Sequence, residues 1–381
     1  MILLTFYQKN CGNDKKLNEI TVTCLEAIVF VLPFLQMNLF SETTNCILNS
    51  LLLHFSTVTF SQSIDAERKT RTVLKLISIT FKMSCKNLEG LLAHQNPLFI
   101  AFQLIYPKYV SLLENTGYDK LFVDSFCEMI SNAIQSAEYL FESVLDVVSQ
   151  QLFKSFKARK TPKPLYVFAE LLSLYPNHIP KLLNLLELFA QETFELIQGD
   201  FEGNADTVRT FFDTVMQPLF YNPQEFLNSQ VLKKTFILLI PCLKIQDLEC
   251  TAAIYRFSVL FWGEKKESLW LGVREKVLSI VGAQLIPALF DSMLNTSHRV
   301  IIYNNSEVLF LILNLEIARK NIQQWLTPVL QNMPLFIQDS HKQHILKVIL
   351  SCKDKSSLNS FVAVISDVVN QRTTADKLLA F

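Results

Sequence analysis

Glycine is scarce in this chain, since only 8 of its 381 residues are glycine. This share of about 2% lies well below the ~7% of average proteins. Glycine-rich phosphate loops and the tight turns of strand-rich folds both depend on this residue. Segments in which Val, Ile and Thr alternate with period two are also few. The sequence therefore predicts an all-α fold of helices joined by short turns.

An excess of charge of one sign is also missing. The 35 Lys and Arg residues balance the 35 Asp and Glu residues, which gives a formal net charge of zero. Proteins that hold nucleic acid or anionic membranes through long-range electrostatics need a basic surface. We therefore predict no nucleic-acid partner, and we expect any charge-driven partner to use a local patch.

The common catalytic and nucleotide-binding motifs are absent: the sequence contains no GxGxxG, GxxxxGK[ST], GxSxG or HExxH. His341, His344 and Cys352 come closest to a metal site, with the two histidines at i,i+3 on one helix face. We interpret them as part of a solvated face, with metal binding as the alternative. Carboxylate pairs such as Glu187 and Glu192 fall on the polar side of an amphipathic helix. The sequence predicts no enzyme, no cofactor and no metal site.

None of the eight cysteines forms a CxxC pair. Most fall within apolar helical stripes, where cysteine packs as a small apolar residue. In a chain of this length, such scattered cysteines are typical of reduced thiols in the cytosol or nucleus. The positions are Cys11, Cys24, Cys46, Cys85, Cys127, Cys242, Cys250 and Cys352.

Only one apolar run near the N-terminus is long enough to cross a bilayer, which requires roughly 20 residues. This segment, 20–40, carries a single charge at Glu26. Polar residues and Pro33 interrupt it, and basic residues flank it on one side only. We interpret the segment as a buried solenoid helix without membrane insertion, with a membrane span as the alternative.

What the sequence does contain is a recurring apolar stripe at helical spacing between Asp206 and Gln331. In the segment 207–219, apolar residues fall at offsets that place them on one face of a helix. Asp206 and Asp247 are positioned to cap the first helices of successive pairs, and their separation of about 40 residues is the period of HEAT-type repeats. A helix pair cannot bury its stripe alone, so the repeats predict an α-solenoid with a binding role.

The domain organisation follows from the turn residues between these stripes. We predict an irregular N-terminus at 1–16, a continuous HEAT-like α-solenoid of antiparallel helix pairs at 17–371, and a frayed tail at 372–381. The predicted helices are 17–38, 43–60, 64–84, 96–114, 119–135, 137–156, 163–174, 178–198, 206–219, 224–243, 247–262, 267–293, 306–317, 319–331, 340–351 and 355–370.

The densest charge feature is a run of five positive side chains within ten residues, at a predicted helix end and turn. It has three interpretations: a solvated turn with cations near a helix C-terminus, a contact for an acidic cargo or partner, or a nucleic-acid contact. We take it as the candidate cargo or partner contact. Its members are Lys154, Lys157, Arg159, Lys160 and Lys163.

Several passages occur in an order that resembles one known family. They include Leu172–Pro176, Gly203–Val208 followed by Phe211-Phe212, and Asn222–Leu227. In the tail, Glu316–Arg319, Trp325-Leu326, Leu330–Pro334 and His341–Gln343 follow. Together they resemble the C-terminal part of the karyopherin-β (importin-β superfamily) nuclear transport receptors, in the importin-13 and transportin-3 branch. The likeness covers residues ~95–371.

This resemblance implies a nuclear import receptor that binds protein cargo and shuttles between cytoplasm and nucleus. Members of the family are more than twice this length, and the resemblance implies that they bind Ran-GTP chiefly through N-terminal repeats. Ran-GTP is therefore expected as a partner only if such repeats are present, whereas weak binding of phenylalanine-glycine nucleoporins fits this portion. The segment Lys120–Gln135 has one Lys and no Arg, which favours an importin-13-like role over recognition of Ser/Arg-rich cargo. The alternative is a HEAT-repeat scaffold with no role in transport.

Overall fold

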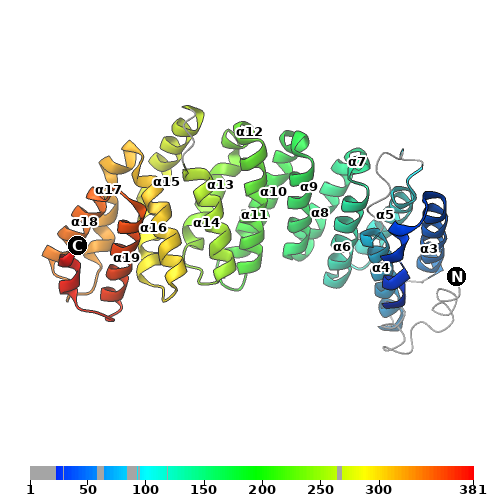
Figure 1. The fold of residues 1–381 in the computed structure, drawn as a ribbon, viewed down its shortest axis with the longest axis horizontal. Helices are drawn as coiled ribbons and strands as arrows, with labels where there is room; N and C mark the ends of the chain where they lie inside the picture. Colours follow the sequence, from blue (N-terminus) through cyan, green and yellow to red (C-terminus); the bar gives the residue numbers. More distant parts are fainter. Residues whose placement is uncertain are drawn as a thin grey trace. The chain divides into compact units, whose positions relative to one another are not determined.

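The computed structural model describes residues 23–28, 30–57, 64–83, 92, 95–117, 119–263 and 268–381. Every regular element in these ranges is a helix, which confirms the all-α prediction (Figure 1). The chain divides into two compact units, Met1–Tyr175 and Pro176–Phe381. The predicted irregular segment 1–16 lies outside the described residues, and the predicted continuity of the solenoid from 17 to 371 stays a prediction.

Unit 1 is built from helices that alternate between two rows along the chain. In one row, α4 contacts α6 and α6 contacts α9. In the other, α3 contacts α5, while α8 pairs with α9 of the first row. The elements are η1 (Leu32–Phe34), α3 (Met37–Thr57), α4 (Ile64–Met83), α5 (Pro97–Asn115), α6 (Lys120–Ser136), α7 (Glu138–Phe141), η2 (Glu142–Val144), α8 (Leu145–Arg159) and α9 (Pro162–Leu174).

Aromatic side chains fill the core of unit 1. The rings of Phe99 and Phe102 on α5 lie 6.2 and 4.6 Å from the ring of Phe141 at the end of α7. The ring of Tyr109 lies 5.2 Å from that of Phe126 on α6. All five side chains are buried. Each aromatic side chain removes about 150–250 Å² from water, so these contacts hold α5 against its neighbours.

Unit 2 repeats the two-row arrangement. The first row consists of α11, α14, α16 and α19, and the second of α10, α13, α15, α17 and α18, each helix contacting the next in its row (Figure 1). Such stacked pairs bury a continuous core between the rows. The elements are η3 (Pro176–His178), α10 (Ile179–Ile197), α11 (Ala205–Tyr221), α12 (Pro223–Leu227), α13 (Gln230–Cys242), α14 (Leu248–Trp262), α15 (Ser268–Leu294), α16 (Arg299–Leu313), α17 (Glu316–Gln331), α18 (Asp339–Ser351), α19 (Lys355–Val369) and η4 (Ala375–Ala380).

One of the two predicted helix caps is confirmed and the other is wrong. Asp247 caps α14, since its Oδ1 accepts from the Cys250 N–H at 2.8 Å. Helix α11 begins at Ala205, so Asp206 lies inside the first turn and forms an ion pair with Arg209 at 3.4 Å. The preceding turn is instead held by Asp200, whose Oδ1 accepts from the Gly203 N–H at 2.8 Å.

The largest boundary error concerns α16, which begins at Arg299 rather than at the predicted residue 306. Its first turns contain Asn305 and Ser306, polar residues that weaken the apolar stripe, yet both are buried. Asn305 donates to the Ser292 hydroxyl at 3.0 Å, and Ser306 donates to the side-chain oxygen of Asn359. Hydrogen bonds to neighbouring helices thus offset the free-energy cost of burying these polar groups.

The segment 20–40 is not the continuous buried helix that we predicted. Pro33 lies in the short 3-10 helix η1, and α3 starts only at Met37. Leu25 and Leu32 are buried, but Phe34 is 78% exposed. Within the described residues, one helix, 269–294, is long and apolar enough to cross a membrane, and 61% of its most apolar window is buried inside the protein. Burial of this kind is expected of a core helix in a solenoid.

The predicted frayed tail at 372–381 differs from the structure. Residues Ala375–Ala380 form the 3-10 helix η4, which contacts both α18 and α19. Leu378 is fully buried, and the ring of Phe381 lies 5.2 Å from that of Phe361. These apolar contacts offset the entropic cost of ordering the end of the chain.

Candidate binding surfaces

The five basic residues singled out in the sequence lie around the turn between α8 and α9. Lys154 and Lys157 are exposed on α8, Arg159 is its last residue, Lys160 is its C-cap and Lys163 lies in the first turn of α9. Cations near a helix C-terminus are stabilised by the helix dipole. This placement agrees with the predicted helix end and turn, while the predicted contact with cargo stays a prediction.

Two of the five residues also have local structural roles. The Arg159 guanidinium donates to the carbonyl of Gly117 at 2.7 Å, which joins the end of α8 to the turn between α5 and α6. Lys160 adopts a left-handed conformation with φ of 53°, and its N–H donates to the Phe156 carbonyl at 2.6 Å. A partner is therefore tested through Lys154, Lys157 and Lys163, whose side chains are exposed.

Acidic groups lie on the helices next to this basic turn. Glu170 on α9 is half-buried, and burial raises its pKa, while hydrogen bonds from Ser131 and Tyr166 oppose the rise. Burial raises the pKa of the Cys127 thiol, an effect that Asp124 adds to and the Lys163 charge opposes. A buried neutral thiol is inert as a nucleophile. The Cys127 thiol therefore supplies no reactive nucleophile between α6 and α9.

The histidines considered as metal ligands have other roles. His341 is buried, and its Nδ1 accepts from the Gln338 N–H at 3.2 Å, which closes a capping box at the start of α18. The His344 ring packs 6.4 Å from that of Phe361. In the described part of the chain, no group of three His, Cys, Asp or Glu side chains could hold a metal ion.

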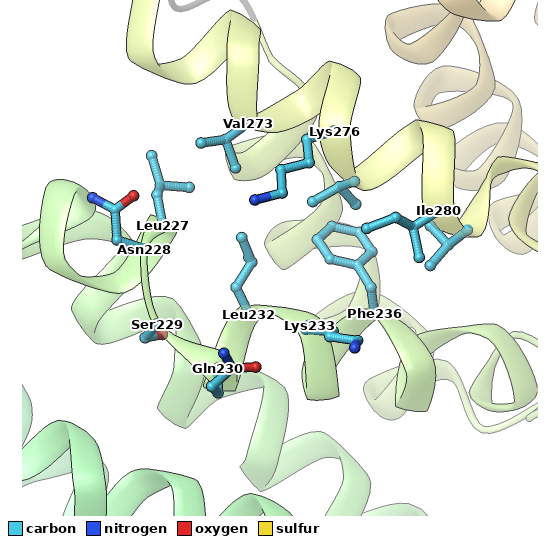
Figure 2. Close-up of a pocket in the computed structure, with 12 residues that line it drawn as sticks. Leu227, Asn228, Ser229, Gln230, Leu232, Lys233, Phe236, Val273, Lys276 and Ile280 are labelled. Atoms are coloured by element: carbon cyan, nitrogen blue, oxygen red, sulfur yellow. The ribbon is translucent and has the colours of Figure 1, made fainter.

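A groove between α13 and α15 of unit 2 was not foreseen from the sequence. It contains a hollow of about 340 Å³ at the start of α13 (Figure 2). Its floor and walls are mostly apolar, and its rim carries two lysines. The hollow is lined by Leu227, Asn228, Ser229, Gln230, Leu232, Lys233, Phe236, Val273, Lys276, Val277, Ile280 and Val281.

The short helix α12 and the turn after it form one end of this hollow. Pro223 starts α12, and the Asn228 side chain donates to the Gln224 carbonyl at 2.9 Å. Ser229 donates its hydroxyl to the Phe226 carbonyl at 2.7 Å, so it makes no side-chain cap for α13. The first N–H groups of α13 therefore lack a side-chain acceptor from their N-cap beside the hollow.

Arg274 holds the opposite wall, α15, against α14. Its side chain is buried, and its Nε donates to the Phe261 carbonyl at 2.6 Å. It also donates to the Gly263 carbonyl, and its guanidinium lies 5.3 Å from the centre of the Trp270 ring. Burial lowers the pKa of this guanidinium from its ordinary, very high value. Arg274 thus satisfies carbonyls at the end of α14 and fixes the start of α15.

The two rim lysines give the hollow a positive charge. Lys233 and Lys276 are both exposed, and within the described residues neither forms an ion pair. By contrast, the adjacent Lys234 pairs with Glu187 at 3.0 Å. Figure 2 shows the Lys276 side chain directed into the space between α13 and α15, above Leu232.

A second hollow of about 710 Å³ continues along the same two helices. It lies at the ends of α13 and α15 and is bounded on its far side by α17. Pro241, Pro287 and Pro328, one from each helix, face it. Each proline lacks an N–H and lies inside a helix. The two hollows follow one another along the groove between α13 and α15.

Comparison with known proteins supports the fold. No family model matches the chain, and no curated protein matches it. Among solved structures, an importin-13 chain in its cytosolic state matches with a TM-score of 0.75 and 16% sequence identity. The match covers 96% of this chain and 42% of the importin-13 chain. This likeness shows that the chain has the helical solenoid fold of karyopherins.

Proposed function

We propose that this chain is the cargo-binding portion of a karyopherin-type nuclear transport receptor. The observation that carries the proposal is the likeness of nearly the whole chain to importin-13, at 96% coverage and a TM-score of 0.75. Karyopherin solenoids are binding surfaces, and the resemblance of the passages from 172 to 343 supports an assignment to the C-terminal arch. An importin-13-like branch is part of the proposal.

The partners proposed are protein cargo and, weakly, phenylalanine-glycine nucleoporins. Ran-GTP is proposed as a partner only if N-terminal repeats are present; this chain spans 42% of the importin-13 chain. The mechanism proposed is binding without catalysis, in which small rotations between stacked helix pairs adapt the surface to the cargo. The protein would shuttle between cytoplasm and nucleus.

Binding to phenylalanine-glycine repeats tests this proposal against the scaffold alternative. The full chain is passed over an immobilised phenylalanine-glycine nucleoporin fragment, with a fragment carrying Phe→Ser substitutions as the control. We expect weak, rapidly reversible retention on the first fragment and none on the second. Equal retention on both, or on neither, would contradict a role in transport and favour a fixed scaffold.

A further inference from the structure

The groove between α13 and α15 leaves apolar side chains at the surface of unit 2. Ile280 is 57% exposed and Ile237 is 43% exposed. Ile280 lines the first hollow, and Ile237 lies on α13, one residue after the lining residue Phe236. Keeping apolar surface in contact with water costs about 25 cal/mol per Å². A contiguous apolar surface with a polar rim is typical of a binding site.

The charges at the groove select the class of ligand. Lys233 and Lys276 face the first hollow from opposite helices and have no ion-pair partner among the described residues. Lys233 lies in the first turn of α13, and a helix N-terminus adds a partial positive charge. At the other end of the groove, Lys244 and Asp291 carry opposite signs. Anionic groups are therefore favoured at the first hollow and not along the whole groove.

The shape of the groove fits a chain segment. The two hollows follow one another between Val273 and Asp291 on α15. At 1.5 Å per helical residue, this stretch is about 27 Å long. An extended peptide of about eight residues spans the same length at ~3.3 Å per residue. The apolar floor favours a peptide over a nucleic acid, whose backbone would leave that floor exposed.

We propose that this groove binds an extended peptide segment of a partner protein in which acidic residues lie at one end of a run of bulky apolar ones. The acidic side chains pair with Lys233 and Lys276, and an apolar side chain enters the first hollow. The following apolar residues run over Ile237 and Ile280 toward the second hollow. If the partner protein is a transported cargo, this inference rests on the proposed function. The binding of an acidic and apolar peptide by the groove does not depend on it.

A peptide selection tests the groove directly. A random peptide library displayed on phage is selected on the full chain, on the Lys233→Glu, Lys276→Glu variant, and on a control. The control is Lys181→Glu, Lys347→Glu, which reverses two exposed lysines on α10 and α18, outside the groove. We expect the wild-type chain and the control to enrich peptides in which Asp or Glu lies at one end of a run of Leu, Ile or Phe, and the groove variant to lose them.

The affinity of one enriched peptide then separates charge from apolar contact. Fluorescence anisotropy should show at least ~10-fold weaker binding to the groove variant. Ile280→Lys adds a positive charge but removes an apolar contact, so it should also weaken binding. Because the Ile280 side chain is mostly exposed, this variant should keep the thermal stability of the wild-type chain.

Three results would overturn the proposal. The first is enrichment of no acidic–apolar peptide, or equal binding to the groove variant. The second is tighter binding to Ile280→Lys, which would mean unspecific charge attraction. The third is displacement of the peptide by poly-uridylic acid, which would assign the groove to nucleic acid. If the peptide binds but phenylalanine-glycine repeats do not, the groove stands and the transport role fails.

Discussion

At the scale of single residues, Gly282 sets how closely two helices of the second row approach. It lies buried in α15, and a Cβ at this position would lie 2.6 Å from Cη2 of Trp325 on α17. No real Cβ tolerates such a distance, and the indole it meets is a rigid ring. The absence of a side chain therefore leaves room for the Trp325 indole against α15.

Gly282→Ala is expected to destabilise the protein by about 1–3 kcal/mol, because overpacking displaces the indole. Helix propensity alone would favour alanine by about 1 kcal/mol. Gly272→Ala is the matched control, since Gly272 lies in the same helix with open space around it. Urea unfolding should show opposite changes for the two variants. A stabilised Gly282→Ala variant would contradict the packing described for Trp325.

The sequence predicted the role of a residue only where its hydrogen-bond partner lies a few residues away in the chain. Asp247 caps the helix that begins at the next residue, so its role could be read from spacing alone. Arg274 and the rim lysines have roles set by side chains or carbonyls contributed by other elements, which spacing does not show. The exposure of Ile237 and Ile280 marks the groove, but exposure is a property of the fold that the sequence does not show. α15 is apolar on most sides, however, so no single stripe reveals which side is buried.

At the scale of elements, the helices were predictable wherever an apolar stripe ends at a turn signal. The structure differs where buried polar residues interrupt the stripe, as in α16, or where a proline divides it, as at η1. The turn between α8 and α9 was located correctly. The sequence did not distinguish between the roles of its five basic residues. In the structure, Arg159 and Lys160 form hydrogen bonds that stabilise the turn.

Reversing Lys154, Lys157 and Lys163 to Glu should weaken binding of an acidic chain about tenfold, since exposed ion pairs contribute about 0.2–1 kcal/mol each. The probe is fluorescein-labelled poly-glutamate, measured by anisotropy in the Lys233→Glu, Lys276→Glu background so that the groove does not contribute. The control reverses three other exposed lysines of unit 1, Lys75, Lys108 and Lys120. An unchanged affinity for poly-glutamate would mean that these basic residues form a solvated turn and not a partner contact.

At the scale of the whole molecule, the amino-acid composition and the repeat period of the apolar helical stripes were sufficient to predict a helical solenoid. Scarce glycine excluded strand-rich folds, and a spacing of about 40 residues matched the helix-pair repeat. The grooves could not be predicted, because they depend on how far neighbouring helices of one row separate. The separation of two neighbouring helices is set by residues far apart in sequence, as it is by Gly282 and Trp325 for α15 and α17.

The most direct measurement of the central claim is transport through the nuclear pore. The chain is fused to a fluorescent protein assembly too large to cross the pore unaided and added to permeabilised cells. A transport receptor should carry this fusion to the nuclear rim and into the nucleus, with competition by excess phenylalanine-glycine fragment. Exclusion of the fusion, at the level of the fluorescent assembly alone, would contradict the transport role.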